Sequence, residues 1–95
     1  MAAGQNLNEM LAIRLPILQA PMAGVSTPAM AAAVSEAGGL GALGLGAATV
    51  DAAAKAICET QALTQRPFNV NFFCPAPQRP DPSADRAWID RAAPL

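Results

Sequence analysis

Short apolar runs alternate with alanine-rich stretches along this chain. The apolar runs are predicted to be strands, because each is brief and ends in small, polar or proline residues. They recur about every 25 residues, a spacing typical of parallel strands joined by crossover helices. The predicted strands cover residues 16–20, 40–45 and 68–73.

The first predicted helix covers residues 27–37. Thr27 is a suitable N-cap, and Pro28 fits the first helical position, where its missing N–H is not needed. Gly38 is expected to end this helix in the left-handed conformation. Helical spacing predicts that its buried face is formed by three residues, Met30, Val34 and Ala37.

The second predicted helix covers residues 50–63, with Thr49 as its N-cap. An ion pair between Asp51 and Lys55 is expected, since the two residues are four positions apart in the favourable order. Its buried stripe is predicted to consist of Ala54, Ile57 and Cys58. A proline-rich loop follows the third strand over residues 74–82, and a third helix is predicted over residues 83–91, capped by Asp81.

The element order is strand, helix, strand, helix, strand, loop, helix, which defines an α/β fold with a parallel sheet. A complete (β/α)₈ barrel takes about 250 residues, and this chain has 95. We interpret residues 1–95 as a partial domain, the N-terminal three βα units of a TIM-type barrel. A small open sheet is the alternative, although the stop soon after a helix favours truncation.

Charge and composition exclude several classes of function. The chain has 6 basic and 7 acidic residues, which argues against binding to nucleic acid or to a charged membrane surface. Prolines interrupt the uncharged stretch between Arg14 and Glu36, so a membrane span is not expected. The chain has 2 cysteines and no histidine, which argues against a metal site. We expect Cys58 and Cys74 to be buried thiols in a cytoplasmic protein.

The glycines of residues 39–44 match the dinucleotide fingerprint G-x-G-x-x-G only formally. That motif must follow a strand and open a helix, so that a pyrophosphate meets the helix N-terminus. Here the glycines follow a helix and enter a strand. The turn that does open a helix covers residues 44–49.

In parallel sheets, ligands bind beyond the carboxyl ends of the strands. Three segments are therefore expected to meet at one edge: residues 20–24, 44–47 and 71–74. Strand alternation places Asn69 and Asn71 on the face opposite Phe68. Asn71 is interpreted either as a ligand contact or as a partner for barrel backbone, and backbone is favoured for Asn69. Met22 is interpreted either as a plug of the barrel or as a contact to a flat ring.

Three segments of this chain are specific as a set: the strand-turn Pro-Ile-Leu-Gln-Ala-Pro-Met-Ala-Gly, the run Ala-Val-Ser-Glu-Ala-Gly-Gly-Leu-Gly-Ala-Leu-Gly, and the segment Arg-Pro-Phe-Asn-Val-Asn-Phe-Phe. Together they resemble the nitronate monooxygenase family. The resemblance covers about residues 13–76, in the family's order and spacing. It implies a TIM-type barrel that holds FMN without a covalent bond. It further implies that FMN is contacted by Ala20, Pro21, Met22 and Ala23 along the ring system, by a hydrogen bond from Asn71, and by Gly46.

The resemblance also implies a reaction. A nitronate and O₂ are converted to a carbonyl compound and nitrite through the flavin, without a nicotinamide. The family's active-site histidine and phosphate-binding loops have no counterpart among these residues, so no catalytic residue is assigned within the chain. The alternatives are an FMN-dependent enoyl-acyl-carrier-protein reductase, an NADH:quinone reductase, or a non-catalytic assembly module. The oligomeric state is left open.

Overall fold

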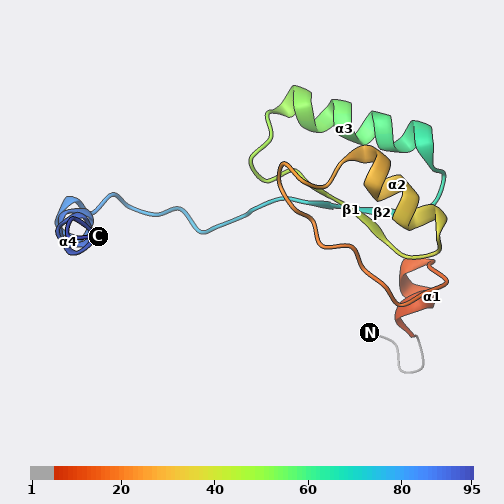
Figure 1. Ribbon diagram of the computed structural model, residues 1–95, viewed down its shortest axis with the longest axis horizontal. Coiled ribbons are helices and arrows are strands. Elements are labelled where there is room, and N and C mark those ends of the chain that lie inside the picture. Colours follow the sequence, from red (N-terminus) through yellow and green to blue (C-terminus); the bar gives the residue numbers. More distant parts are fainter. Residues whose placement is uncertain (1–5) are drawn as a thin grey trace.

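Two parallel strands, β1 (Gly41–Gly44) and β2 (Phe68–Asn71), form the sheet, which a computed structural model describes together with the rest of residues 6–95. The register pairs Gly41 with Phe68 and Gly44 with Asn71. On the other side of β1, Leu18 forms a single parallel bridge with Leu40. The fold is therefore α/β with parallel strands, as Figure 1 shows.

The strand predicted over residues 16–20 is reduced to the single bridge at Leu18. Proline has no backbone N–H to donate to a ladder, and Pro16 and Pro21 stand at both ends of this segment. Only two ladder bonds form, from Leu40 N to Ile17 O and from Gln19 N to Leu40 O, both 2.9 Å long. The other two strands are present, each shorter than the predicted range.

Helix α2 (Pro28–Glu36) has the predicted residues at its two ends, Thr27 as the N-cap and Gly38 after the last turn. The Thr27 hydroxyl accepts a hydrogen bond from the Met30 N–H at 3.1 Å, which confirms the N-cap. At the other end Gly38 has a φ of 104°, and its N–H donates to the Ser35 carbonyl at 3.1 Å. The Gly39 N–H donates to the Val34 carbonyl, which completes a Schellman motif.

Helix α3 (Val50–Leu63) matches its predicted bounds and is capped by Thr49, whose hydroxyl accepts from the Ala52 N–H at 3.2 Å. The predicted Asp51–Lys55 pair is wrong. Lys55 instead pairs with Glu59 at 3.7 Å, one turn further along the helix. Because 3.6 residues make one turn, Lys55 has a neighbour on either side along the surface and only one of them is engaged.

The core lies between the sheet and the two helices α2 and α3, which cover the same side of it (Figure 1). Leu43 of β1 and Leu45, which directly follows β1, belong to this layer, and Phe68 packs against it from β2. The helices contribute alanines, Ala31 from α2 and Ala53 from α3.

The predicted buried faces of both helices are shifted by one position. In α2 the buried residues are Ala31, Ala32 and Ser35, whereas Met30 is exposed. In α3 they are Ala53 and Thr60, whereas Ala54 and Cys58 are exposed; of the predicted stripe, Ile57 is half-buried and packs against the core. Small residues face the sheet because they let the helix backbone come close, an effect that a search for large apolar residues misses.

Ser35 joins α2 to both strands. Its hydroxyl donates to the Pro67 carbonyl at 2.9 Å and accepts from the Gly41 N–H at 3.0 Å. Ser35 is 1% exposed, and its bond from the Gly41 N–H is buried, whereas the bond to Pro67 is only partly buried. One side chain therefore fixes the start of β1 relative to the start of β2.

Helix α1 (Leu7–Leu11) was not predicted and precedes the first bridge. Asn6 caps it by accepting from the Glu9 N–H at 3.0 Å. Just after it, the Arg14 guanidinium donates to the Ala37 carbonyl at 2.8 Å, at the C-terminal end of α2. This bond places a cation where the helix dipole is negative.

Helix α4 (Pro82–Ala92) lies far from the other elements, at the end of an extended segment (Figure 1). Its predicted cap is confirmed, since Asp81 accepts from the Ser83 and Ala84 N–H groups at 3.1 Å. All residues from 72 to 95 are exposed. The radius of gyration is 18.5 Å, compared with about 12 Å for a compact domain of this length.

Candidate functional site

The segment of residues 20–24, here named the Ala-Pro-Met turn, passes directly over the carboxyl end of β1. A Cβ on Gly44 would lie 2.9 Å from the Ala23 nitrogen and 3.0 Å from the Met22 carbonyl carbon. Only glycine leaves room for so close an approach of two backbones. The structure thus brings together two of the three segments that the sequence places at this edge.

The Ala-Pro-Met turn is held by Ser26, which the sequence reasoning did not single out. The Ser26 hydroxyl accepts from the Met22 N–H at 2.9 Å and donates to the Ala20 carbonyl at 3.2 Å. The Ser26 N–H donates in turn to the Met22 carbonyl at 2.8 Å. Gly24, with a φ of 75°, allows the reversal. The sequence signal was a serine two residues beyond a glycine, which favours a side-chain-closed turn.

The third segment reaches the same edge through Phe73. A Cβ on Gly46 would lie 2.5 Å from Cε2 of the Phe73 ring, so the ring covers Gly46. Phe73 is itself 70% exposed. All three expected segments therefore converge beyond the carboxyl ends of the strands.

Asn71 ends β2 directly beside Gly44. Its carbonyl accepts from the Leu45 N–H at 3.0 Å, while its side-chain amide forms no hydrogen bond within residues 6–95. Asn69 lies two pairs earlier, beside Ala42, and is exposed. Of the two asparagines, Asn71 is thus the one next to the Ala-Pro-Met turn.

This edge of the sheet presents backbone hydrogen-bond donors and carries no ionisable side chain. The segments 20–26, 44–47 and 71–73 include no acidic or basic residue. Over the part of the chain that the structure describes, the backbone N–H groups of Ala20, Ala23 and Gly46 donate to no protein acceptor. Met22, 41% exposed, presents a flexible thioether beside them. Such a surface suits a flat, polar-edged ligand.

Metal binding and membrane insertion find no support among residues 6–95. No group of three or more potential metal-ligating side chains is found there. No helix there combines the length and apolarity that crossing a membrane requires. The expectation of buried thiols is wrong, because Cys58 and Cys74 are both exposed. Cys58 lies outside the buried stripe of α3, and Cys74 follows the last strand into the exposed loop.

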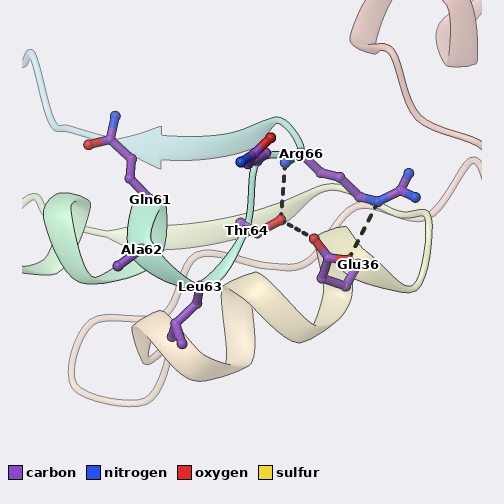
Figure 2. A pocket seen from close by; sticks show the side chains of 7 residues that line it. Glu36, Gln61, Ala62, Leu63, Thr64 and Arg66 are labelled. Carbon is purple, nitrogen blue, oxygen red and sulfur yellow. Dashed lines mark hydrogen bonds and ion pairs between the residues drawn. The ribbon is translucent and has the colours of Figure 1, made fainter.

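A hollow of about 560 Å³ lies at the opposite edge, where β2 begins. Figure 2 shows that its polar groups bind one another: Thr64 donates to Glu36 at 2.6 Å, and the Arg66 guanidinium lies 3.7 Å from the same carboxylate. The Arg66 N–H also donates to the Thr64 hydroxyl at 3.1 Å. This mutually satisfied cluster lies at the N-terminal ends of the strands, opposite the edge that the Ala-Pro-Met turn crosses.

The geometry defines a class of protein, a parallel α/β protein with an uncharged candidate site at the carboxyl ends of its strands. The sequence model described as "Nitronate monooxygenase" matches residues 5–93. This chain belongs to the nitronate monooxygenase family.

Two named relatives are nitronate monooxygenases from Paraburkholderia phytofirmans, 56% identical over 90% of this chain, and from Pseudomonas aeruginosa, 51% identical over 90% of it. The matches cover 23% and 24% of those proteins, so this chain spans about a quarter of their length. Much of each relative therefore has no counterpart among these residues.

Solved structures show the same arrangement of elements. A nitroalkane oxidase from Streptomyces ansochromogenes is 47% identical, with a TM-score of 0.73 over 86% of this chain and 23% of its own. FabK from Thermotoga maritima is 48% identical, with a TM-score of 0.68 over 74% of this chain and 22% of its own. The fold is thus shared by proteins with different names.

Proposed function

We propose that this chain supplies one wall of an FMN site in a TIM-type barrel that oxidises alkyl nitronates with O₂ to a carbonyl compound and nitrite. In this proposal the chain forms the first three βα units of the barrel. The observation that carries it is the convergence of the Ala-Pro-Met turn, Gly46 and Asn71 at one strand edge, in a chain of this family.

The residues at this edge would fit a flavin. The backbone of the Ala-Pro-Met turn lies against Gly44, and the N–H groups of Ala23 and Gly46, which donate to no backbone acceptor among the described residues, would be available to polar atoms on the edge of a ring. Ala20, Pro21, Met22 and Ala23 would lie along the isoalloxazine. The free amide of Asn71 would hydrogen-bond the flavin.

FMN, when bound, supplies the redox chemistry that passes electrons from a nitronate to O₂. The residues of this chain bind and orient the ring system. They hold no acid or base at the edge, so any proton transfer belongs to groups outside these segments. The free backbone donors supply fixed dipoles at the ring.

FMN titration of the protein that contains these residues, followed by quenching of flavin fluorescence, tests the binding role. Asn71→Ala is expected to raise the Kd for FMN about tenfold, because one hydrogen bond is lost. Asn69→Ala is the matched control, being on the same strand but beside Ala42 rather than Gly44. Equal Kd values for both variants would contradict the assignment of Asn71.

Nitrite release and oxygen consumption with ethylnitronate or propionate 3-nitronate test the reaction. Both are expected with bound FMN and without a nicotinamide. Rapid reduction of the flavin by NADH, with no turnover of either nitronate, would assign the protein to the reductases instead.

A further inference from the structure

We infer that Gln19 is a positioning residue that lets the Ala-Pro-Met turn leave the sheet and cross over β1. The inference rests on the proposed function and adds a residue that does not itself need to contact the flavin. The evidence lies in the hydrogen bonds that follow the bridge between Leu18 and Leu40.

Gln19 ends the ladder with its side chain. Its N–H donates to the Leu40 carbonyl at 2.9 Å, as a parallel pair requires. At the next step the Ala42 N–H donates to Oε1 of the Gln19 side chain at 3.0 Å, and not to a backbone carbonyl. One ladder bond is thus replaced by a side-chain bond.

This replacement frees the following backbone. The next ladder bond would need the N–H that Pro21 lacks, so the strand has to end at this point. Because the side chain of Gln19 satisfies Ala42, the main chain turns away at Ala20 without leaving a buried donor on β1 unpaired. The turn then crosses Gly44, where Ala23 makes its close approach.

The nitrogen of the Gln19 side-chain amide argues against the interpretation that Gln19 only fills space. Nε2 of Gln19 is buried and has no hydrogen-bond partner among the described residues. The Ala42 N–H fixes which end of the amide is oxygen, so rotation cannot relieve this donor. A methionine would fill similar space without an unsatisfied donor. The side-chain oxygen Oε1, which accepts from the Ala42 N–H, is therefore the atom that makes glutamine suitable at this position.

Two substitutions separate the roles, in the protein that contains this chain. Gln19→Met removes the acceptor at similar volume, whereas Gln19→Glu keeps an oxygen for Ala42, whether or not the carboxyl is ionised. Gln61→Met is the matched control, the same change at an exposed position of α3. The measurements are amide hydrogen exchange, the Kd for FMN and the visible spectrum of the bound flavin.

With Gln19→Met, faster exchange is expected at Ala42 and at Ser26, together with an FMN Kd raised about tenfold and a shifted flavin spectrum. Gln19→Glu is expected to restore slow exchange and most of the affinity. Gln61→Met is expected to change none of these.

Faster exchange at Ala42 alone, with Ser26 and the FMN Kd unchanged, would overturn the inference. So would a Gln19→Glu protein that folds yet binds FMN as weakly as Gln19→Met. If the wild-type protein binds no FMN, the proposed function fails. The exchange at Ser26 in the flavin-free protein still decides whether Gln19 positions the turn.

Discussion

Two glycines show how differently single residues are constrained in this molecule. A Cβ on Gly41 would collide with the Ala31 carbonyl group, 2.6 Å from its carbon, because α2 crosses β1 there. For a Cβ on Gly46, the nearest atoms belong to the Phe73 ring. The first contact is backbone held by a helix and a strand, and the second is the end of an exposed side chain.

Substitution of these glycines by alanine should therefore give unequal losses of stability. Gly41→Ala is expected to lower the free energy of unfolding by about 3 kcal/mol, since neither backbone can move without breaking hydrogen bonds. Gly46→Ala is expected to cost less than about 1 kcal/mol, because Phe73 turns away. Urea unfolding followed by circular dichroism measures both. Similar losses at the two sites would show that the Phe73 ring is held more firmly than its exposure indicates.

At the scale of elements, hydrogen bonds from a few polar side chains align helices with strands. Ser35 is the main example, since it links α2 to the Gly41 N–H and to the Pro67 carbonyl. Among residues 6–95 the sheet has two strands and one further bridge, so few backbone bonds share this task. The alignment of β1 with β2 should depend strongly on this hydroxyl.

Ser35→Ala is expected to lower the free energy of unfolding by about 2–3 kcal/mol, because it leaves the buried Gly41 N–H and the Pro67 carbonyl without their partner. Ser83→Ala in the exposed helix α4 is the control and is expected to change the free energy by less than about 0.5 kcal/mol. Chemical unfolding of both variants under one set of conditions makes the comparison. A loss at Ser35 no greater than at Ser83 would refute the linking role.

At the scale of the whole molecule, much apolar surface is uncovered. The accessible surface is 7143 Å² for 9.7 kDa, against about 5,100 Å² for a compact protein of that mass. Phe72 and Trp88 are 53% and 68% exposed. The excess of about 2,000 Å² is as large as a stable protein–protein interface.

The 95-residue chain by itself should therefore self-associate. Sedimentation velocity over a wide range of concentrations is expected to show a sedimentation coefficient that rises with concentration, because association covers the apolar residues. Removal of residues 82–95 should reduce this association by deleting Trp88 and Ile89. A chain that remains monomeric at every concentration, with a sharp unfolding transition, would contradict the prediction.

The local elements could be read from the sequence because local rules fix them. Thr27, Thr49 and Asp81 cap their helices as predicted, and Gly38 ends α2, since each depends on bonds within a few residues. The family motifs also predicted which strand ends carry the candidate site. The roles proposed there for Asn71 and for the Ala-Pro-Met turn stay predictions.

What the sequence by itself determined was thus helices α2, α3 and α4, the order of the strands along the chain, and the family. Only the tertiary structure decided which helix faces are buried, that the strand predicted over residues 16–20 reduces to one bridge, that Ser26 holds the Ala-Pro-Met turn, and that the side chain of Gln19 accepts from the Ala42 N–H. These outcomes depend on contacts between residues distant in the chain, such as Gly41 with Ala31 and Gln19 with Ala42. Periodicity reports which residues share a face. It does not report how closely another backbone will approach that face.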